Sequence, residues 1–330
     1  RSVSGDEEEL LEYLITWYKE KDVDLQIVGT NLIIEYDGSG PSRIFNAHID
    51  TVKPGGWDTD PFSLKEGKDR YYGLGVSDMK VTIHILMNLH KYFQTIDNKV
   101  ILTFVEKEET TGEGSEKITE FLDEEYEVDD ALCVIGEPTD AEWFEIGNRG
   151  NVFFKKEIKG KSVHSGRPSE GENAVKKAMK EIEDDKQILK QKHEKNETLG
   201  TSTLAMPTQM DGGSSINTVP GKTTYTGDFR TVPENHENVV KTLHSMGYDI
   251  VSETKPYLLK DENILAGLKE HGELRISPGS NDATFFSQIN IPTVVFGAGT
   301  KKCIHQPEEY VLKENIEKTK EIYKTLLTIK

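Results

Sequence analysis

The chain has 330 residues, of which 35% are hydrophobic and 30% are charged, and its formal net charge is −18. This length is enough for one large or two ordinary domains. The excess of acidic side chains argues against nucleic acid and anionic membranes as partners, and no apolar run approaches the roughly 18 residues of a membrane span. We therefore expect a soluble globular protein.

The two cysteines limit the redox chemistry that the chain can support. Cys133 lies in the apolar run ALCVIG and is predicted to be a core thiol. Cys303 lies in a loop, two residues before His305. Because two cysteines form neither a disulfide framework nor a cysteine zinc site, we expect a reducing cytoplasmic environment.

Helical and extended patterns alternate near both ends of the chain. Apolar spacing and turn residues predict helices at residues 7–21, 79–93, 115–122 and 313–327, and strands at residues 24–36, 43–49, 99–105, 131–135 and 292–296. Near-continuous apolar runs such as KVILTFV are typical of strands buried on both faces of a parallel sheet. The alternation indicates an α/β domain with a mostly parallel sheet and helices on both faces.

Two predicted helix starts carry side chains that suit an N-cap. Ser77 or Asp78 precedes the helix at 79–93, and Asp282 precedes a short helix at 283–286. Such side chains accept a hydrogen bond from a free backbone N–H of the first helical turn. Ser77 or Asp78 is thus a good cap candidate, and Asp282 could equally be a cap or part of a substrate-side turn.

The pattern changes between residues 149 and 257. The predicted order there is a strand, a helix, two strands, a helix and a strand, at residues 151–158, 171–189, 201–209, 223–230, 234–246 and 248–253. This β-α-β-β-α-β order is ferredoxin-like. We predict an α+β domain at 149–257, inserted into a discontinuous first domain that consists of residues 1–148 and 258–330.

Side chains that can bind a metal follow the predicted strands of the first domain. Four strands end in, or lead to, such groups, and Asp78 starts a helix on the same rim; the five groups are His48, Asp78, Glu108/Glu109, Glu137 and His305. Ligands of parallel sheets bind beyond the carboxyl ends of the strands. The pair His48 and Asp50 alone would favour a structural or merely exposed strand end over a metal site. The convergence of five groups favours a metal centre.

Six motifs occur in a specific order along nearly the whole chain. They are HIDT, GLGVSDMK, EKEETTGEG, GEPT, SVHSGRPSEGENAV and IHQPEE. Each motif is weak alone, but together they resemble the dinuclear zinc acylase and metallopeptidase family. That family includes acetylornithine deacetylase, succinyl-diaminopimelate desuccinylase, aminoacylase and carboxypeptidase G.

The resemblance implies a centre of two divalent metal ions. His48, Asp78 and Glu137 would hold one ion, and Asp78, Glu109 and His305 would hold the other, so that Asp78 bridges them. Each ion would then have three protein ligands and an open place for a shared water, as in catalytic zinc sites. Zinc is the expected metal, and cobalt or manganese would also suit this mixed ligand set.

The resemblance also implies the catalytic roles. Asp50 would orient His48, and Glu108 would be the general base that takes a proton from the metal-bridging water. His164, in the inserted domain, would reach the active site of the other subunit and help hold the oxyanion. A homodimer is therefore expected.

Four further residues are predicted to contact the substrate. Arg230 resembles the family's arginine for a substrate carboxylate, with a simple pairing to Asp228 as the alternative. Asn217 resembles a lid asparagine, or else a turn residue. Gly279 and Ser280 resemble a Gly-rich turn on the substrate side.

The favoured function is removal of an acetyl or succinyl group from an amino acid such as ornithine, lysine or diaminopimelate, in arginine or lysine biosynthesis. Glu137 favours deacylation, because the family has Asp at this position in several aminopeptidases. One alternative is a dipeptidase or carboxypeptidase with the same centre, acting on a short peptide. A metal-stabilised binding protein without hydrolytic activity is the other.

Overall fold

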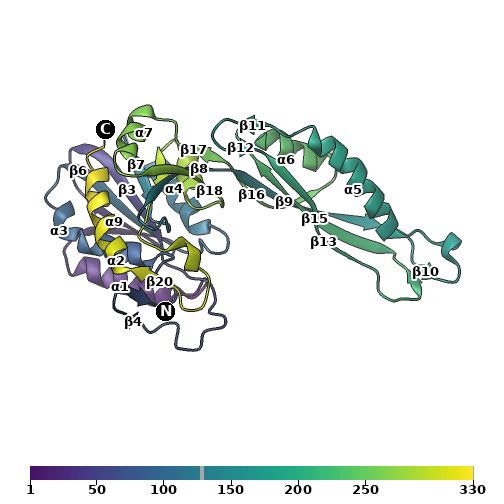
Figure 1. Cartoon of the computed structure of the whole chain (residues 1–330), viewed down its shortest axis with the longest axis horizontal. Helices are drawn as coiled ribbons and strands as arrows, with labels where there is room; N and C mark the ends of the chain where they lie inside the picture. The colour runs from purple at the N-terminus through teal and green to yellow at the C-terminus, as the bar shows by residue number, and fades with distance from the viewer. Residues whose placement is uncertain (127–129, 330) are drawn as a thin grey trace. The chain divides into compact units, whose positions relative to one another are not determined.

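A nine-stranded β-sheet organises the larger part of the chain in the computed structural model, which describes residues 1–126 and 130–329 (Figure 1). The chain divides into a first unit, Arg1–Gly147, Leu258–Ile276 and Asn281–Lys330, and a second unit, Asn148–Tyr257 and Ser277–Ser280. The sequence prediction assigned residues 277–280 to the first domain. They group with the second unit, where Ser280 Oγ donates to Asn151 Oδ1 at 2.6 Å.

The sheet has a parallel centre and antiparallel flanks. Its strands are, in spatial order, β1 (Asp24–Val28), β2 (Asn31–Tyr36), β6 (Asn98–Val105), β3 (Gly40–His48), β7 (Leu132–Ile135), β19 (Thr293–Val295), β8 (Trp143–Asn148) and β17 (Tyr257–Leu258), with β18 (Glu273–Ser277) paired to β8. The four strands from β6 to β19 run parallel, which confirms the predicted α/β class. The strand predicted at 24–36 is instead a hairpin that turns at Gly29, where φ is +65°.

Helices cover both faces of this sheet, as predicted. The helices of the first unit are α1 (Glu8–Lys19), α2 (Lys80–Asn88), α3 (His90–Phe93), α4 (Glu113–Glu125), α7 (Glu262–Lys269), α8 (Ala283–Gln288) and α9 (Lys313–Leu326). The first unit also contains a 3₁₀ turn, η2 (Lys301–Cys303), and a small sheet of β4 (Lys65–Glu66), β5 (Arg70–Tyr72) and β20 (Tyr310–Leu312). None of the helices in the described ranges combines the length and apolarity that a membrane span needs.

The core of the first unit fixes β3 and therefore the residue at its end. Alternate side chains of a strand point to opposite faces. Phe45 and Ala47 lie in the core cluster that includes residues of α1, α2 and α9, and the ring of Phe45 lies 5.0 Å from that of Tyr323. Burying a phenylalanine contributes about 1.5–3 kcal/mol to folding. Asn46 and His48 consequently point to the opposite face.

Neither candidate side-chain cap forms. Helix α2 has Met79 at its N-cap position and no side-chain cap, and Ser77 Oγ donates instead to the carbonyl of Tyr310 at 2.6 Å. Asp282 occupies the N-cap position of α8, but its carboxylate makes no capping bond and accepts from Asn46 Nδ2 at 3.0 Å. Tertiary partners outcompete the local N–H groups in both cases.

The second unit has the predicted ferredoxin-like order. Its main elements are β9 (Gly150–Lys159), α5 (Ala174–Lys190), β13 (Thr203–Gly212), β15 (Lys222–Thr231), α6 (His236–Ser245) and β16 (Asp249–Thr254). The strands form an antiparallel sheet in the order β13-β15-β9-β16. Short elements are β10 (Val163–His164) paired with β14 (Thr218–Val219), β11 (Lys195–Asn196) paired with β12 (Gly200–Thr201), and η1 (Pro168–Glu170).

Candidate metal centre

His48 ends β3 and is fully buried. Its Nδ1 lies 3.0 Å from the carbonyl oxygen of Asp50 and 3.4 Å from Asp50 Oδ1. Since both are acceptors, Nδ1 carries a proton, and Nε2 faces Asp78 Oδ1 at 3.1 Å and Glu137 Oε1 at 3.5 Å. Burial lowers the pKa of His48, but hydrogen bonds to Asp50 and Asp78 and the charge of Glu137 outweigh it and raise the pKa well above its ordinary value. Nε2 therefore lies where a positive charge is stabilised.

Asp78 lies between two groups of candidate ligands. Its Oδ1 faces His48, and its Oδ2 lies 3.1 Å from His305 Nε2, which is also 2.9 Å from Glu109 Oε2. Hydrogen bonds with Asp78 and Glu109 raise the pKa of His305 to about 10. Burial raises the pKa of Asp78, but hydrogen bonds from the two histidines outweigh it and lower that pKa. The two carboxylate oxygens of Asp78 thus face two different histidines, His48 and His305.

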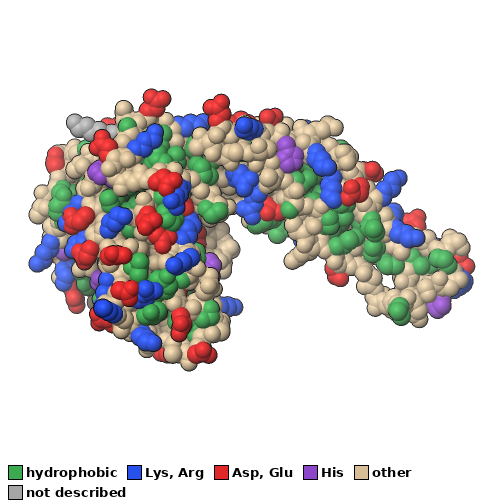
Figure 2. Space-filling view, viewed as in Figure 1, with side chains coloured by type: hydrophobic (Ala, Val, Ile, Leu, Met, Phe, Trp, Pro, Cys, Tyr) green, Lys and Arg blue, Asp and Glu red, His purple; other side chains and the backbone are tan. Residues whose placement is uncertain are grey.

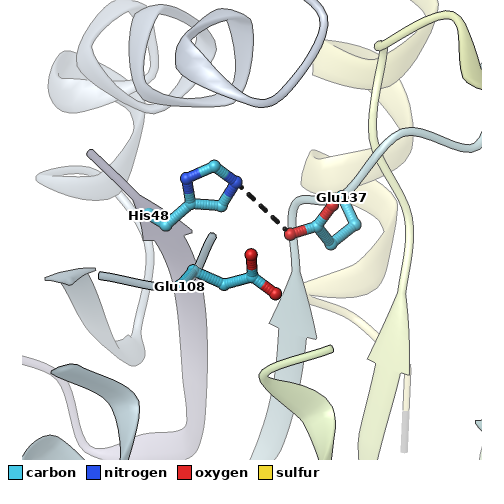
Figure 3. A group of neighbouring side chains, drawn as sticks. All are labelled: His48, Glu108 and Glu137. Carbon is cyan, nitrogen blue, oxygen red and sulfur yellow. Dashed lines mark ion pairs between the residues drawn. The ribbon is translucent and has the colours of Figure 1, made fainter. Parts of the chain in front are cut away.

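Glu108 and Glu137 complete the cluster (Figure 3). One ligand atom each of His48, Glu108 and Glu137 lie within 4.8 Å of one another, and the same holds for His48, Asp78 and Glu109. Burial is the main cause that raises the pKa of both Glu108 and Glu137, and neighbouring carboxylates add to it. The structure thus brings together the general-base candidate and all five predicted ligands, at the end of β3, on the segments that follow β6, β7 and β19, and on the loop before α2.

The donor set fits two divalent cations. Glu137 Oε1 is buried and accepts no hydrogen bond from the part of the chain that the structure describes. Buried carboxylates this close to one another are costly unless positive charge compensates them. Imidazole nitrogens with carboxylate oxygens are ligands that zinc, cobalt and manganese accept. One cation on each side of Asp78 would neutralise the cluster.

Asp50 has a wider role in the structure than the sequence suggested. Its Oδ1 accepts from the backbone N–H of Glu108 at 3.1 Å, and its Oδ2 accepts from Glu109 N at 3.2 Å and from Ser4 Oγ at 2.6 Å. The hydrogen bonds with His48 and Ser4 overcome burial and lower the pKa of Asp50. Asp50 therefore links the imidazole of His48 to the turn that carries Glu108 and Glu109.

Asp282, which the sequence offered as a helix cap or part of a substrate-side turn, is a buried carboxylate next to the cluster. Asp282 accepts from Asn46 Nδ2, and Asn46 Oδ1 in turn accepts from Thr103 Oγ1 at 2.7 Å. Burial raises the pKa of Asp282 to about 6, and its charge contributes to the raised pKa of Glu108. Asn46 precedes His48 by two residues on the same strand face, which was the one available signal.

His164 and Asn217 are neighbours in the second unit. His164 in β10 pairs with Thr218 in β14, and the N–H of Ser165 donates to the carbonyl of Asn217 at 2.8 Å. The N–H of Gly166 donates to His164 Nδ1 at 3.1 Å. An accepting Nδ1 leaves the proton on Nε2. The exposed imidazole of His164 is thus in the tautomer that can donate from Nε2 to an oxyanion.

Arg230 and Ser280 also belong to the second unit. Arg230 Nε donates to Asp228 Oδ2 at 2.9 Å, so the pairing that was its alternative role is present. In the described part of the chain its terminal nitrogens have no hydrogen-bond partner. Arg230 pairs in register with Asn151, whose side chain accepts from Ser280. A Cβ on Gly279 would meet nothing within 4 Å.

Comparisons with known proteins point to one family. The model of the family described as peptidase family M20/M25/M40 matches residues 44–329. A probable succinyl-diaminopimelate desuccinylase of Staphylococcus epidermidis is 26% identical, over 96% of this chain and 91% of its own length. Acetylornithine deacetylase of Vibrio parahaemolyticus is 28% identical, over 94% and 88%. A Staphylococcus aureus tripeptidase shares the fold, with a TM-score of 0.79 and 18% identity over 99% of this chain and 94% of its own.

Proposed function

The chain belongs to peptidase family M20/M25/M40 and is a metallo-hydrolase of amide or peptide bonds, and we propose that it removes an acetyl or succinyl group from an amino acid such as ornithine, lysine or diaminopimelate. The observation that carries this proposal is the position of Asp78 between His48 and His305, with Glu108 beside the cluster. Two curated relatives that match nearly the full chain, a probable succinyl-diaminopimelate desuccinylase and an acetylornithine deacetylase, support an acylated amino acid over a peptide.

Each residue of the centre has a proposed role. His48, Asp78, Glu137, Glu109 and His305 would hold two divalent cations, zinc by preference and cobalt or manganese as alternatives. When bound, such a pair acidifies water and polarises the amide carbonyl.

The proton transfers would belong to the chain itself. Glu108, whose raised pKa suits a general base, would take a proton from the attacking water and deliver it to the leaving nitrogen. Asp50 would hold both the imidazole of His48 and the backbone of Glu108 in place during that transfer.

The second unit would act as a dimerisation and lid domain. It exposes large apolar side chains, among them Phe153 at 37% and Val251 at 58% exposure, and Figure 2 shows hydrophobic side chains on its surface. In a homodimer, its His164 would donate from Nε2 to the oxyanion at the partner's centre. Asn217, Gly279 and Ser280 would line the substrate side.

The substrate class is testable with the purified, zinc-loaded chain. N-acetyl-ornithine, N-acetyl-lysine, N-succinyl-diaminopimelate and a panel of dipeptides and tripeptides would be compared by the release of free amine. We expect at least one acylated amino acid to have the highest kcat/KM, and chelator treatment to abolish its hydrolysis. If the chain prefers peptides, it is a peptidase and not a deacylase. If it hydrolyses none of these compounds, the proposal is contradicted.

Arg230 is proposed to bind the substrate carboxylate with its free terminal nitrogens. Arg230→Ala should raise KM by about 10- to 100-fold, because a charged hydrogen-bonding partner is lost. Asp228→Asn is the matched control, since it removes the negative charge from the ion pair with Arg230 and keeps the guanidinium. The carboxamide form of the best substrate should bind wild type and Arg230→Ala equally. Equal defects in both variants would show that Arg230 serves only its pairing with Asp228.

A further inference from the structure

Glu309 is a buried carboxylate that the proposed chemistry does not use. It lies just before β20 and is 1% exposed. Its Oε1 accepts from the backbone N–H of Ser77 at 2.7 Å and of Asp78 at 3.1 Å, and its Oε2 accepts from the N–H of Gly75 at 3.0 Å. One carboxylate thus receives three backbone donors from the loop that delivers Asp78.

The same loop is bound to the chain on either side of His305. Ser77 Oγ donates to the carbonyl of Tyr310 at 2.6 Å and accepts from the N–H of Thr300 at 2.8 Å. The N–H of Gly73 donates to the carbonyl of Glu309 at 3.1 Å. The loop with Asp78 and the loop with His305 therefore form one hydrogen-bonded assembly with the Glu309 carboxylate inside it.

The two groups around Asp78 differ in how their members are supported. His48 is the last residue of β3, and Glu137 follows β7 by two residues, so both lie closer to a strand than Glu109 does to β6 or His305 does to β19. Asp78, Glu109 and His305 all lie on loops, and the side chain of His305 is 47% exposed. If this assembly loosened, only Asp78 would be displaced from the group of His48, Asp78 and Glu137. In the group of Asp78, Glu109 and His305, both Asp78 and His305 would be displaced.

We propose that Glu309 is a positioning residue that places Asp78 and the loop of His305, and that it sets the affinity of the second cation place, formed by Asp78, Glu109 and His305. The inference rests on the proposed two-cation centre. Carboxylates that accept several backbone N–H groups form strong, directional contacts, and groups that orient metal ligands typically change metal affinity by about 10- to 100-fold when removed.

Glu309→Gln in the full chain tests the proposal, with Glu308→Gln as its matched control. A glutamine carbonyl can still accept from Ser77 and Asp78, but its NH₂ group would face the N–H of Gly75, donor against donor. Glu308 is the adjacent, exposed acid, so its variant removes the same charge outside the assembly. Binding of Zn²⁺ and Co²⁺ to the metal-free proteins would be measured by equilibrium dialysis, with the Co²⁺ absorption spectrum as a second readout.

We expect wild type and Glu308→Gln to bind two cations, and Glu309→Gln to bind the first with wild-type affinity and the second at least about 10-fold more weakly. The proposal would be overturned if Glu309→Gln lowered the affinity of both cation places equally and also lowered the Tm, or if it changed the affinity of neither place. A wild-type chain that binds only one cation would also overturn it. If Glu309→Gln does not fold, Glu309→Asp must show the same selective weakening of the second cation. Aspartate is shorter by one methylene, so its carboxylate lies farther from the N–H groups of Gly75, Ser77 and Asp78. Absence of turnover on the substrate panel would contradict the proposed function alone, since the readout is binding.

Discussion

Glu108→Gln is expected to lower kcat by about 10²–10⁴-fold and to leave the bound metal unchanged. Glutamine keeps the shape of the side chain, but its neutral amide group is not basic enough to take a proton from water. Glu108 points to the space beside His48 and Glu137 (Figure 3) and is held by its own backbone N–H on Asp50, so the substitution leaves that hydrogen bond intact.

The measurement is kcat on the best substrate of the panel, together with metal content by elemental analysis. Glu120→Gln, on the exposed face of α4, is the control for removal of one acidic charge. Full turnover in Glu108→Gln would exclude Glu108 as the base. Loss of metal along with turnover would assign it to the ligands instead.

His164→Ala is expected to lower kcat by about 10²–10³-fold, the usual cost of one lost oxyanion donor. KM should change little, because the donor acts on charge that develops during the reaction. The structure supports this role through the hydrogen bond from Gly166 N, which leaves the imidazole proton on Nε2.

Mixing the two inactive variants tests whether His164 acts in the partner subunit. If Glu108→Gln and His164→Ala chains exchange freely, half of the dimers are mixed and each has one intact site, so about a quarter of wild-type activity should return. Activity that stays absent after exchange, with dimers confirmed by mass in solution, would place His164 in its own subunit's site. A monomeric mass with full wild-type activity would contradict the dimer altogether.

Much of the fold followed from local patterns. Apolar runs such as residues 99–105 located the buried strands, and their carboxyl ends share one edge because β6, β3, β7 and β19 are parallel. The hairpin of β1 and β2 was missed, since both of its strands carry similar apolar spacing and a single Gly29 marks the turn. The antiparallel flanks depend on strand pairing, which periodicity does not report.

The capping predictions show why local chemistry can mislead at a functional site. Ser77, Asp78 and Asp282 all have side chains that favour an N-cap, yet each is used by a partner far along the chain. In the folded chain these side chains bond to distant partners instead of to the N–H groups of the first helical turn.

The sequence by itself determined which side chains end the parallel strands of this protein. His48, Glu137 and the pair Glu108–Glu109 meet at one edge because parallel strands all finish there. Only the tertiary structure decided how the supporting carboxylates are used. Asp50, Asp282 and Glu309 have partners 58, 236 and 234 residues away. A buried carboxylate must find hydrogen-bond donors wherever the folded chain provides them, and no local pattern contains that information.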